Sequence, residues 1–140
     1  MAEPREILER SRTVAVVGAS TDESKPSHSV PARLQRAGFN VIPVNPSGKE
    51  ILGRVAAKSL SEIDEPIDVV EVFRPAEEAP EIAREAVAVG AKTLWLQLGI
   101  RSDEARRIAE EGGLDFIEDH CMGRERDRYD ITKEPMDVVS

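Results

Sequence analysis

Five short apolar runs alternate with helix-like segments along this chain, and that alternation restricts its fold more than any other feature. The runs occupy residues 13–17, 39–44, 67–73, 92–98 and 114–118. They are nearly continuous in apolar and β-branched residues, which is typical of strands buried on both faces. Strands that alternate with helices at this spacing predict right-handed crossovers. We therefore expect an α/β fold with a doubly wound parallel five-stranded sheet, the strand order 3-2-1-4-5 and helices on both faces.

The segments between the runs contain apolar residues at helical spacing, and several of these segments end in glycine. They predict helices over residues 29–37, 76–89 and 102–111, with a short helix around residue 7. Residues 46–63 lack this pattern, so we expect a loop with one helical turn there.

The length of the chain indicates one domain. Its 140 residues are enough to bury a core but too few for a cofactor domain plus a catalytic domain. We expect a single domain over residues 1–123, followed by a tail over residues 124–140 that forms no separate domain. The tail is polar and weakly patterned, so we expect partly ordered packing or a flexible end.

The charge and the single cysteine exclude several partners and settings. The net charge is −8, so nucleic acid and anionic membranes would be repelled, and we expect neither as a partner. A small anion is still compatible, because backbone N–H groups and a few cations can form a positive pocket. Cys121 stands alone, which excludes an internal disulfide and fits a cytoplasmic protein. The N-terminus lacks the apolar run of a signal peptide, and no segment approaches the roughly 20 apolar residues of a membrane span.

The carboxyl ends of parallel strands meet in a crevice, where doubly wound folds bind their ligands. Gly18, Ala19 and Ser20 follow the first run, and Lys25 and Ser27 lead into the next helix. Glycine lets the backbone approach a phosphate, the helix N-terminus supplies N–H donors, and lysine adds a charge. This turn is therefore a candidate anion site. The alternative is that Gly18 only makes a tight turn and that Lys25 is solvated.

Two common phosphate-binding motifs are absent. The residues after Gly18 do not follow the GxGxxG pattern, and no acidic residue ends the second run to hold a ribose hydroxyl. A P-loop is excluded as well, because Glu50 follows Gly48 and Lys49. These absences weaken the case for NAD and favour other adenine nucleotides.

Several motifs follow one another in a fixed order along most of the chain. They are VAVVGAS, KPS, GFNVIPVNP, EILG, DVVEVFRP, GAKTLWLQLGI and DFIEDHC. Together they resemble the small CoA-binding protein family, whose domain is similar to the N-terminal CoA-binding domain of the succinyl-CoA synthetase α subunit. The resemblance implies a Rossmann-like fold that binds coenzyme A (CoA).

The resemblance also implies roles for the residues at the strand ends. It assigns the phosphates to Gly18, Ala19, Ser20, Lys25 and Ser27, and Pro26 is also expected to contact the cofactor. It assigns the adenine and ribose side to Val44, Asn45, Pro46, Phe73, Arg74 and Pro75. Adenine favours an apolar or guanidinium face, which agrees with this assignment. The pantetheine arm is expected to face Gln97 and Gly99. The alternative is that Phe73 belongs to the core and Arg74 is a surface cation.

The two histidines make no case for catalysis. His28 lies in the candidate anion loop, where a polar residue at a helix N-terminus is common. His120 stands beside Cys121, but adjacent side chains on an extended chain point to opposite sides. We predict no catalytic residue and no metal site.

We therefore expect a non-catalytic carrier, sensor or partner module that holds CoA or acyl-CoA, with a protein partner that the sequence does not identify. Two alternatives stay open: a nucleotide-binding component of an acyl-CoA ligase that acts with a partner, and an NAD(P)-dependent oxidoreductase. A mixed disulfide between Cys121 and the CoA thiol is a further hypothesis.

Overall fold

The computed structural model describes residues 2–134. Its elements in chain order are α1 (Pro4–Arg10), β1 (Thr13–Val17), α2 (Pro26–Arg36), β2 (Asn40–Val44), β3 (Glu50–Ile51), β4 (Arg54–Val55), η1 (Leu60–Glu62), β5 (Val69–Val72), η2 (Ala76–Glu78), α3 (Ala79–Ala88), β6 (Thr93–Leu96), α4 (Asp103–Glu111), β7 (Asp115–Ile117) and α5 (Met122–Arg128). The longest helix, α2, has 11 residues, and no helix within the described range is long and apolar enough to cross a membrane.

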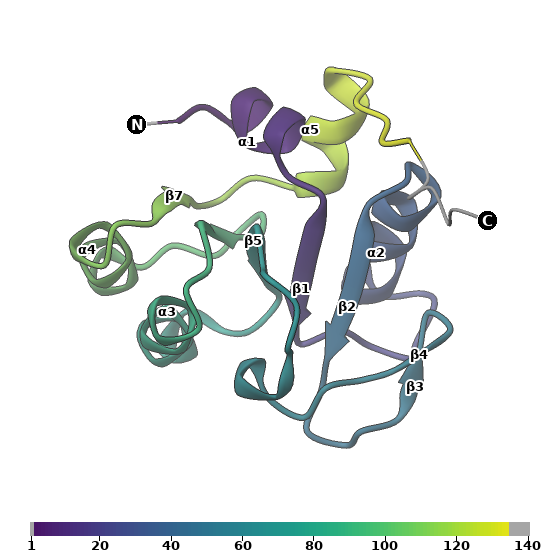
Figure 1. Cartoon of the computed structure of the whole chain (residues 1–140), viewed down its shortest axis with the longest axis horizontal. Helices are drawn as coiled ribbons and strands as arrows, with labels where there is room; N and C mark the ends of the chain where they lie inside the picture. Colours follow the sequence, from purple (N-terminus) through teal and green to yellow (C-terminus); the bar gives the residue numbers. More distant parts are fainter. Residues whose placement is uncertain (1, 135–140) are drawn as a thin grey trace.

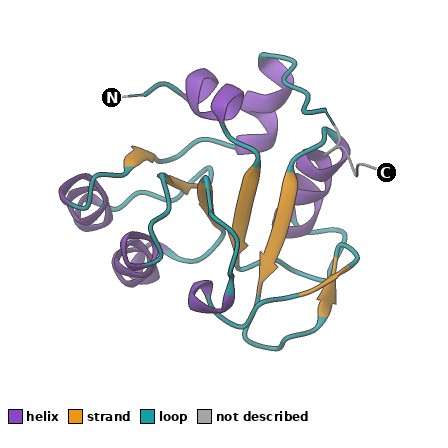
Figure 2. Ribbon diagram, viewed as in Figure 1, coloured by secondary structure: helices purple, strands orange, loops and turns teal. Residues whose placement is uncertain are grey.

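Five parallel strands form the central sheet, in the order β2-β1-β5-β6-β7 (Figures 1 and 2). Each of the five apolar runs holds one of these strands, so the predicted α/β fold with a parallel sheet is confirmed. The strands are short, and the burial of their residues on both faces agrees with the continuous apolar runs.

The order of the strands differs from the predicted 3-2-1-4-5. Counted along the five strands, it is 2-1-3-4-5, because β5 pairs with β1 and not with β2. The outer edge of β2 is occupied by Ala57, whose N–H donates to the Pro43 carbonyl at 3.0 Å and whose carbonyl accepts from the Asn45 N–H at 2.8 Å. Pro43 has no N–H to offer on that edge, which disfavours a full strand there. The third strand therefore pairs on the other side of β1.

Helices cover both faces of the sheet, as predicted. On one face α3 and α4 pack against Val70, Leu94 and Phe116. On the other face α1, α2 and α5 pack against strand residues that include Trp95 (Figure 1). Ser102 begins α4 as expected, because its Oγ accepts a hydrogen bond from the Ala105 N–H.

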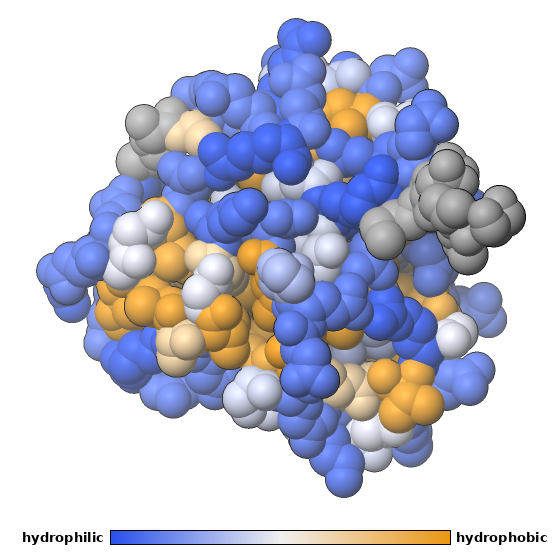
Figure 3. Space-filling model, viewed as in Figure 1, coloured by the Kyte–Doolittle hydropathy of each residue, from blue (hydrophilic) through white to orange (hydrophobic). Residues whose placement is uncertain are grey.

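Charged and polar side chains dominate the face of the molecule shown in Figure 3. Hydrophobic side chains appear over α3 and α4 and near the β3–β4 hairpin, where Val55 is 74% exposed. Within residues 2–134 the other large apolar side chains are buried or pack against the two core layers, with the exception of Leu98, which is 51% exposed at the end of β6.

The first part of the predicted tail packs against the domain. α5 buries Met122 and Gly123 and contacts α1 and α2. Beyond α5, the Lys133 N–H donates to the Ala37 carbonyl at 2.7 Å. Gly38 follows Ala37 with a φ of +98°, and a Cβ there would collide with the Lys133 carbonyl oxygen. Residues 135–140 of the predicted tail lie outside the described residues.

Glu71 is the side chain least suited to its surroundings. It is fully buried in β5, between Val16 of β1 and Trp95 of β6. Neither of its carboxylate oxygens has a hydrogen-bond partner in the described part of the chain. Loss of hydration of the charged form raises the pKa of Glu71 from 4.5 to about 8. The carboxyl group of Glu71 is therefore protonated and uncharged below about pH 8.

Glu71→Gln should stabilise the protein, and the gain should increase from about pH 5 to about pH 8. In the unfolded chain the carboxyl group ionises near its usual pKa, whereas the folded protein keeps it protonated up to about pH 8. Folding must therefore bind a proton at a cost that grows with pH to the order of 4 kcal/mol, and Gln removes that cost. Thermal midpoints measured across this range test the prediction, with the exposed loop variant Glu23→Gln as control. A gain that does not change with pH would contradict it.

Candidate functional site

The strands β1, β2, β5 and β6 are parallel, so their carboxyl ends lie along the same edge of the sheet, which the arrowheads of β1 and β2 mark in Figure 1. After β1 the chain forms β2 on one side of β1, and it later forms β5 on the other side of β1. The direction in which strands are added to the sheet therefore reverses between β1 and β5. α2 covers one face of the sheet beside this point, and α3 covers the other. Doubly wound folds bind their ligands at such a reversal.

Two hollows open at this edge. The lysine hollow, named for Lys49 and Lys58, has a volume of about 1030 Å³ and lies between the turns after β1 and β2 and helix α3. The arginine hollow, named for Arg33 and Arg124, has a volume of about 590 Å³ and lies between α2, α5 and the ends of β5 and β6. The two hollows adjoin, because both are lined by Lys25, Ser27, Phe73 and Arg74.

The structure brings together all but one of the residues predicted for the site. The lysine hollow is lined by Gly18, Ala19, Ser20, Lys25, Ser27, Val44, Asn45, Pro46, Phe73 and Arg74. The arginine hollow adds Pro26, Pro75 and Gln97. Gly99 lines neither hollow, and its N–H donates instead to Asp119 Oδ1 at 2.7 Å.

A glycine is required where the turn after β1 meets the end of β5. Gly18 has a φ of +90°, and a Cβ there would lie 2.8 Å from the Phe73 carbonyl oxygen and 2.9 Å from Arg74 Cδ. Only glycine, which has no Cβ, allows the two backbone segments to approach so closely. The aliphatic part of Arg74 therefore covers Gly18, at the boundary between the two hollows.

Polar side chains tie the loops of the site to one another. Asn45 Nδ2 donates to the Ala19 carbonyl at 2.9 Å and so joins the turn after β2 to the turn after β1. His28 Nδ1 donates to the Ser20 carbonyl at 2.8 Å, and Ser20 Oγ accepts from the Asp22 N–H at 3.0 Å. His28 thus shapes the loop before α2 through its ring nitrogen.

The lysine hollow has walls of opposite charge. The side of the β1 and β2 turns carries Lys25, Lys49 and Lys58, and the side of η2 and α3 carries Glu77, Glu78, Glu81 and Glu85. Lys25, the N-cap residue of α2, makes no capping hydrogen bond through its side chain, and the positive end of the helix dipole adds positive potential to the lysine side. An anion is therefore favoured beside the turns and disfavoured beside α3.

The charge of Arg74 is already paired with Glu78. Arg74 Nε and Nη2 donate to the two oxygens of Glu78 at 3.1 and 2.8 Å. These hydrogen bonds raise the pKa of Arg74 and lower the pKa of Glu78, so both side chains are charged. Both are about half exposed, which makes the pair a weak contributor to stability. An anion bound in either hollow would share Arg74 with Glu78.

The arginine hollow combines apolar walls with positive charge. Its apolar lining includes Val30, Phe73, Leu98 and Ile100, and Cys121 lies among them. Its charged lining consists of Lys25, Arg33, Arg74 and Arg124, and no Asp or Glu lines it within residues 2–134.

Sequence reasoning missed the helical residues of the arginine hollow. Val30 and Arg33 lie on α2, three residues apart and therefore on one face of the helix. That spacing could have indicated a shared wall. Arg124 lies on α5, which no apolar periodicity predicted.

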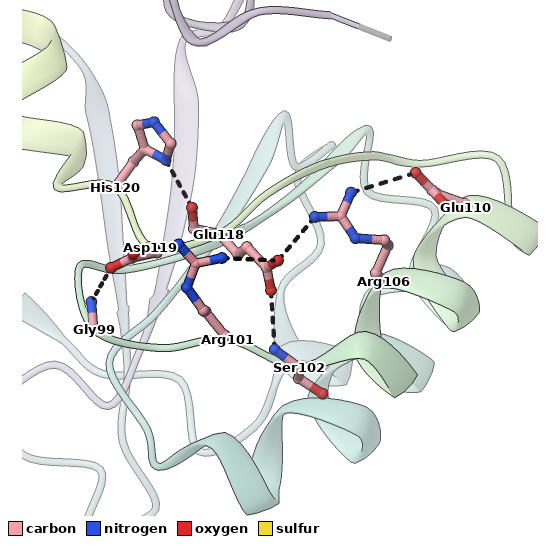
Figure 4. A network of polar contacts seen from close by, with 8 residues as sticks. All are labelled: Gly99, Arg101, Ser102, Arg106, Glu110, Glu118, Asp119 and His120. Carbon is pink, nitrogen blue, oxygen red and sulfur yellow. Dashed lines mark hydrogen bonds and ion pairs between the residues drawn. The ribbon is translucent and has the colours of Figure 1, made fainter.

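A network of charged side chains holds the two loops at one end of the arginine hollow (Figure 4). Asp119, at a φ of +56°, accepts from the Gly99 N–H at 2.7 Å and from Arg101 Nη2 at 2.8 Å, and these bonds lower its pKa. Glu118 accepts from Arg106 Nη2 at 2.8 Å. The network fixes the loops that bring Leu98, Ile100 and Cys121 to the wall of the hollow.

His120 and Cys121 face different surroundings, as expected of neighbours on an extended chain. Cys121 is buried and lines the arginine hollow, whereas His120 Nδ1 donates to the Glu118 carbonyl at 2.7 Å (Figure 4). The His120 carbonyl in turn accepts from Trp95 Nε1 at 2.9 Å. The single tryptophan of the chain thus anchors the backbone beside Cys121.

Known proteins share this sequence pattern and this fold. A family model described as CoA binding domain matches residues 12–127. The uncharacterised protein YneT of Bacillus subtilis is 45% identical over 121 residues, which cover 86% of this chain and 90% of that protein. The ADP-forming acetate–CoA ligase I of Archaeoglobus fulgidus is 27% identical over 122 residues, which cover 80% of this chain but 18% of the ligase.

A solved structure agrees with the sequence matches. A hypothetical protein from Pyrococcus horikoshii superimposes with a TM-score of 0.87 and 36% identity, over 90% of this chain and 89% of its own. The resemblance that the motifs indicated is confirmed by the family model, which matches most of the chain. The fold, the strand-end groove and this match lead to one conclusion: the chain belongs to the CoA binding domain family.

Proposed function

We propose that the protein holds CoA or acyl-CoA across the two hollows and performs no catalytic step of its own. One observation carries the proposal: two adjoining hollows of different chemistry lie at the strand ends of a CoA binding domain. CoA has two parts that differ in the same way, a phosphorylated nucleotide and an uncharged pantetheine arm. Both volumes, about 1030 and 590 Å³, are comparable to those of ligand pockets.

The lysine hollow is the proposed site of the nucleotide. Phosphates beside the Gly18 turn would meet the N-terminus of α2 and the ammonium groups of Lys25, Lys49 and Lys58. The carboxylates on the α3 side would repel the phosphates and so keep them at the turns. Val44 and Pro46 offer apolar surface to the adenine.

The arginine hollow is the proposed site of the pantetheine arm. Phe73, Leu98 and Ile100 provide apolar surface for its carbon chain. Gln97 Oε1 accepts from the Met122 N–H at 3.3 Å, which orients the amide so that its own N–H group would donate to a carbonyl of the arm. In this orientation the thiol end of the arm would lie near Cys121.

The similarity to acetate–CoA ligases supports one alternative, a component that binds CoA for a ligase partner. This chain spans 15% to 18% of the curated ligases that it matches, so their complete activity is not assigned to it. An NAD(P)-dependent oxidoreductase has less support, because β2 is followed by Asn45 and not by the acid that holds a ribose hydroxyl in NAD sites.

CoA should raise the thermal midpoint of the protein, whereas NAD and ATP at equal concentration should not. A ligand at a hundredfold excess over its Kd adds about 2.7 kcal/mol, which moves the midpoint by several degrees. Scanning fluorimetry with each ligand measures this effect. Stabilisation by NADPH without stabilisation by CoA would contradict the proposal and favour the oxidoreductase. ADP release from ATP in the presence of acetate and CoA would contradict its non-catalytic part.

Lys25→Gln should weaken CoA binding about tenfold, because a charge-assisted contact with phosphate is lost. Isothermal titration calorimetry at two salt concentrations measures the change, which should shrink at higher salt. Lys92→Gln is the matched control, since this exposed lysine precedes β6 at the opposite end of the strands. If both variants lost affinity equally, net charge alone would explain the effect, and a contact at Lys25 would be refuted.

CoA should protect Cys121 from alkylation if the pantetheine arm fills the arginine hollow. Cys121 is the single cysteine, so the intact mass after iodoacetamide treatment reports on it alone. Adenosine 3′,5′-bisphosphate carries the nucleotide without the arm and should leave Cys121 reactive. Equal protection by both ligands would be evidence against the proposed orientation.

A further inference from the structure

We propose that the arginine hollow selects acyl groups that end in a carboxylate, and that Arg124 and Arg33 bind this carboxylate. The inference rests on the proposed function, because it takes the pantetheine arm to enter this hollow. It names the class of acyl group that the site holds.

The arginine hollow is lined by two cations that the lysine hollow does not share. Two of its four cations, Lys25 and Arg74, line both hollows and can bind the phosphates. The other two, Arg33 and Arg124, line only the arginine hollow. No carboxylate from the described part of the chain lines this hollow, although the chain carries a net charge of −8. The pantetheine arm is uncharged and would leave both arginines without a partner in the ligand.

Arg124 is available to an incoming anion. The ion pairs of α5 are made by Arg126 and Asp127, and within residues 2–134 Arg124 takes part in none. Its side chain is exposed at the edge of the hollow, in the first turn of α5. Cys121 immediately precedes this helix, so Arg124 lies one turn beyond the proposed position of the thiol.

Arg33 reaches the same place from α2. A Cβ at Gly123 would lie 2.9 Å from Arg33 Nη2 and 3.3 Å from Val30 Cγ1, so the absence of a side chain at Gly123 lets α2 and α5 approach each other. Arg33 Nη1 donates to Asp127 Oδ2 at 2.9 Å, which orients the guanidinium group. Arg33 and Arg124 thus line the hollow from two helices that meet at Gly123.

An acyl chain with a terminal carboxylate matches both properties of the hollow. Its methylene groups would contact Val30, Leu98 and Ile100. Its carboxylate would accept hydrogen bonds from Arg124, with Arg33 beside it, in the forked geometry that guanidinium groups favour. Such bonds are stronger beside apolar walls than in open water. An uncharged acyl group would fill the same space without making them.

Two pairs of thioesters separate the effect of the carboxylate from that of chain length: glutaryl-CoA with pentanoyl-CoA, and malonyl-CoA with propanoyl-CoA. Calorimetric titration of the full chain should show that at least one charged member binds about tenfold more tightly than its uncharged counterpart. Arg124→Gln should reduce this ratio to less than about twofold. The control Arg128→Gln, one turn further along α5 and outside the lining of the hollow, should keep the ratio of the wild-type protein.

Three results would count against the inference. Equal affinities within both pairs, together with tight binding of CoA, would overturn it and leave the proposed function intact. A loss of affinity for adenosine 3′,5′-bisphosphate in Arg124→Gln would overturn it as well, because the arginines would then serve the phosphates of the nucleotide. If the wild-type protein bound no CoA, both proposals would fail. Thermal midpoints of both variants confirm that they are folded.

Discussion

The ligand groove depends on the parallel pairing of β1 with β5. The last pair in this register is Val17 with Val72, so the chain leaves both strands side by side at the edge of the sheet. Gly18 then passes so close to the Phe73 carbonyl that no side chain fits between them. From this contact α2 continues over one face of the sheet and α3 over the other. The space between these diverging segments becomes the two hollows.

Local placement of charge matters more for this site than the net charge of −8. In the lysine hollow, ammonium groups and the N-terminus of α2 face a row of carboxylates, so an anion has one favourable side. In the arginine hollow, cations stand beside apolar walls without carboxylates from residues 2–134. An acidic protein can therefore provide one environment for phosphate groups and a separate one for a carbon chain.

The positions of the strands and of the groove could be predicted from the sequence, because they depend on local burial and on topology. Continuous apolar runs located the strands, and strand ends located the residues of the groove from Gly18 to Gln97. The strand order was wrong because it depends on a distant contact, that of Ala57 with the edge of β2. Arg124 was missed because α5 consists mostly of charged residues and buries only Met122 and Gly123, which leaves no apolar period to recognise.

The hydrogen bond from the indole of Trp95 to the His120 carbonyl joins the interior of the sheet to the backbone that precedes Cys121. A buried indole needs such a partner, and here the partner directly precedes Cys121, which lines the arginine hollow. Because the chain contains one tryptophan, all of its tryptophan fluorescence comes from this position. The indole is thus an intrinsic fluorescent probe, whose emission wavelength and intensity report any displacement of the backbone beside Cys121.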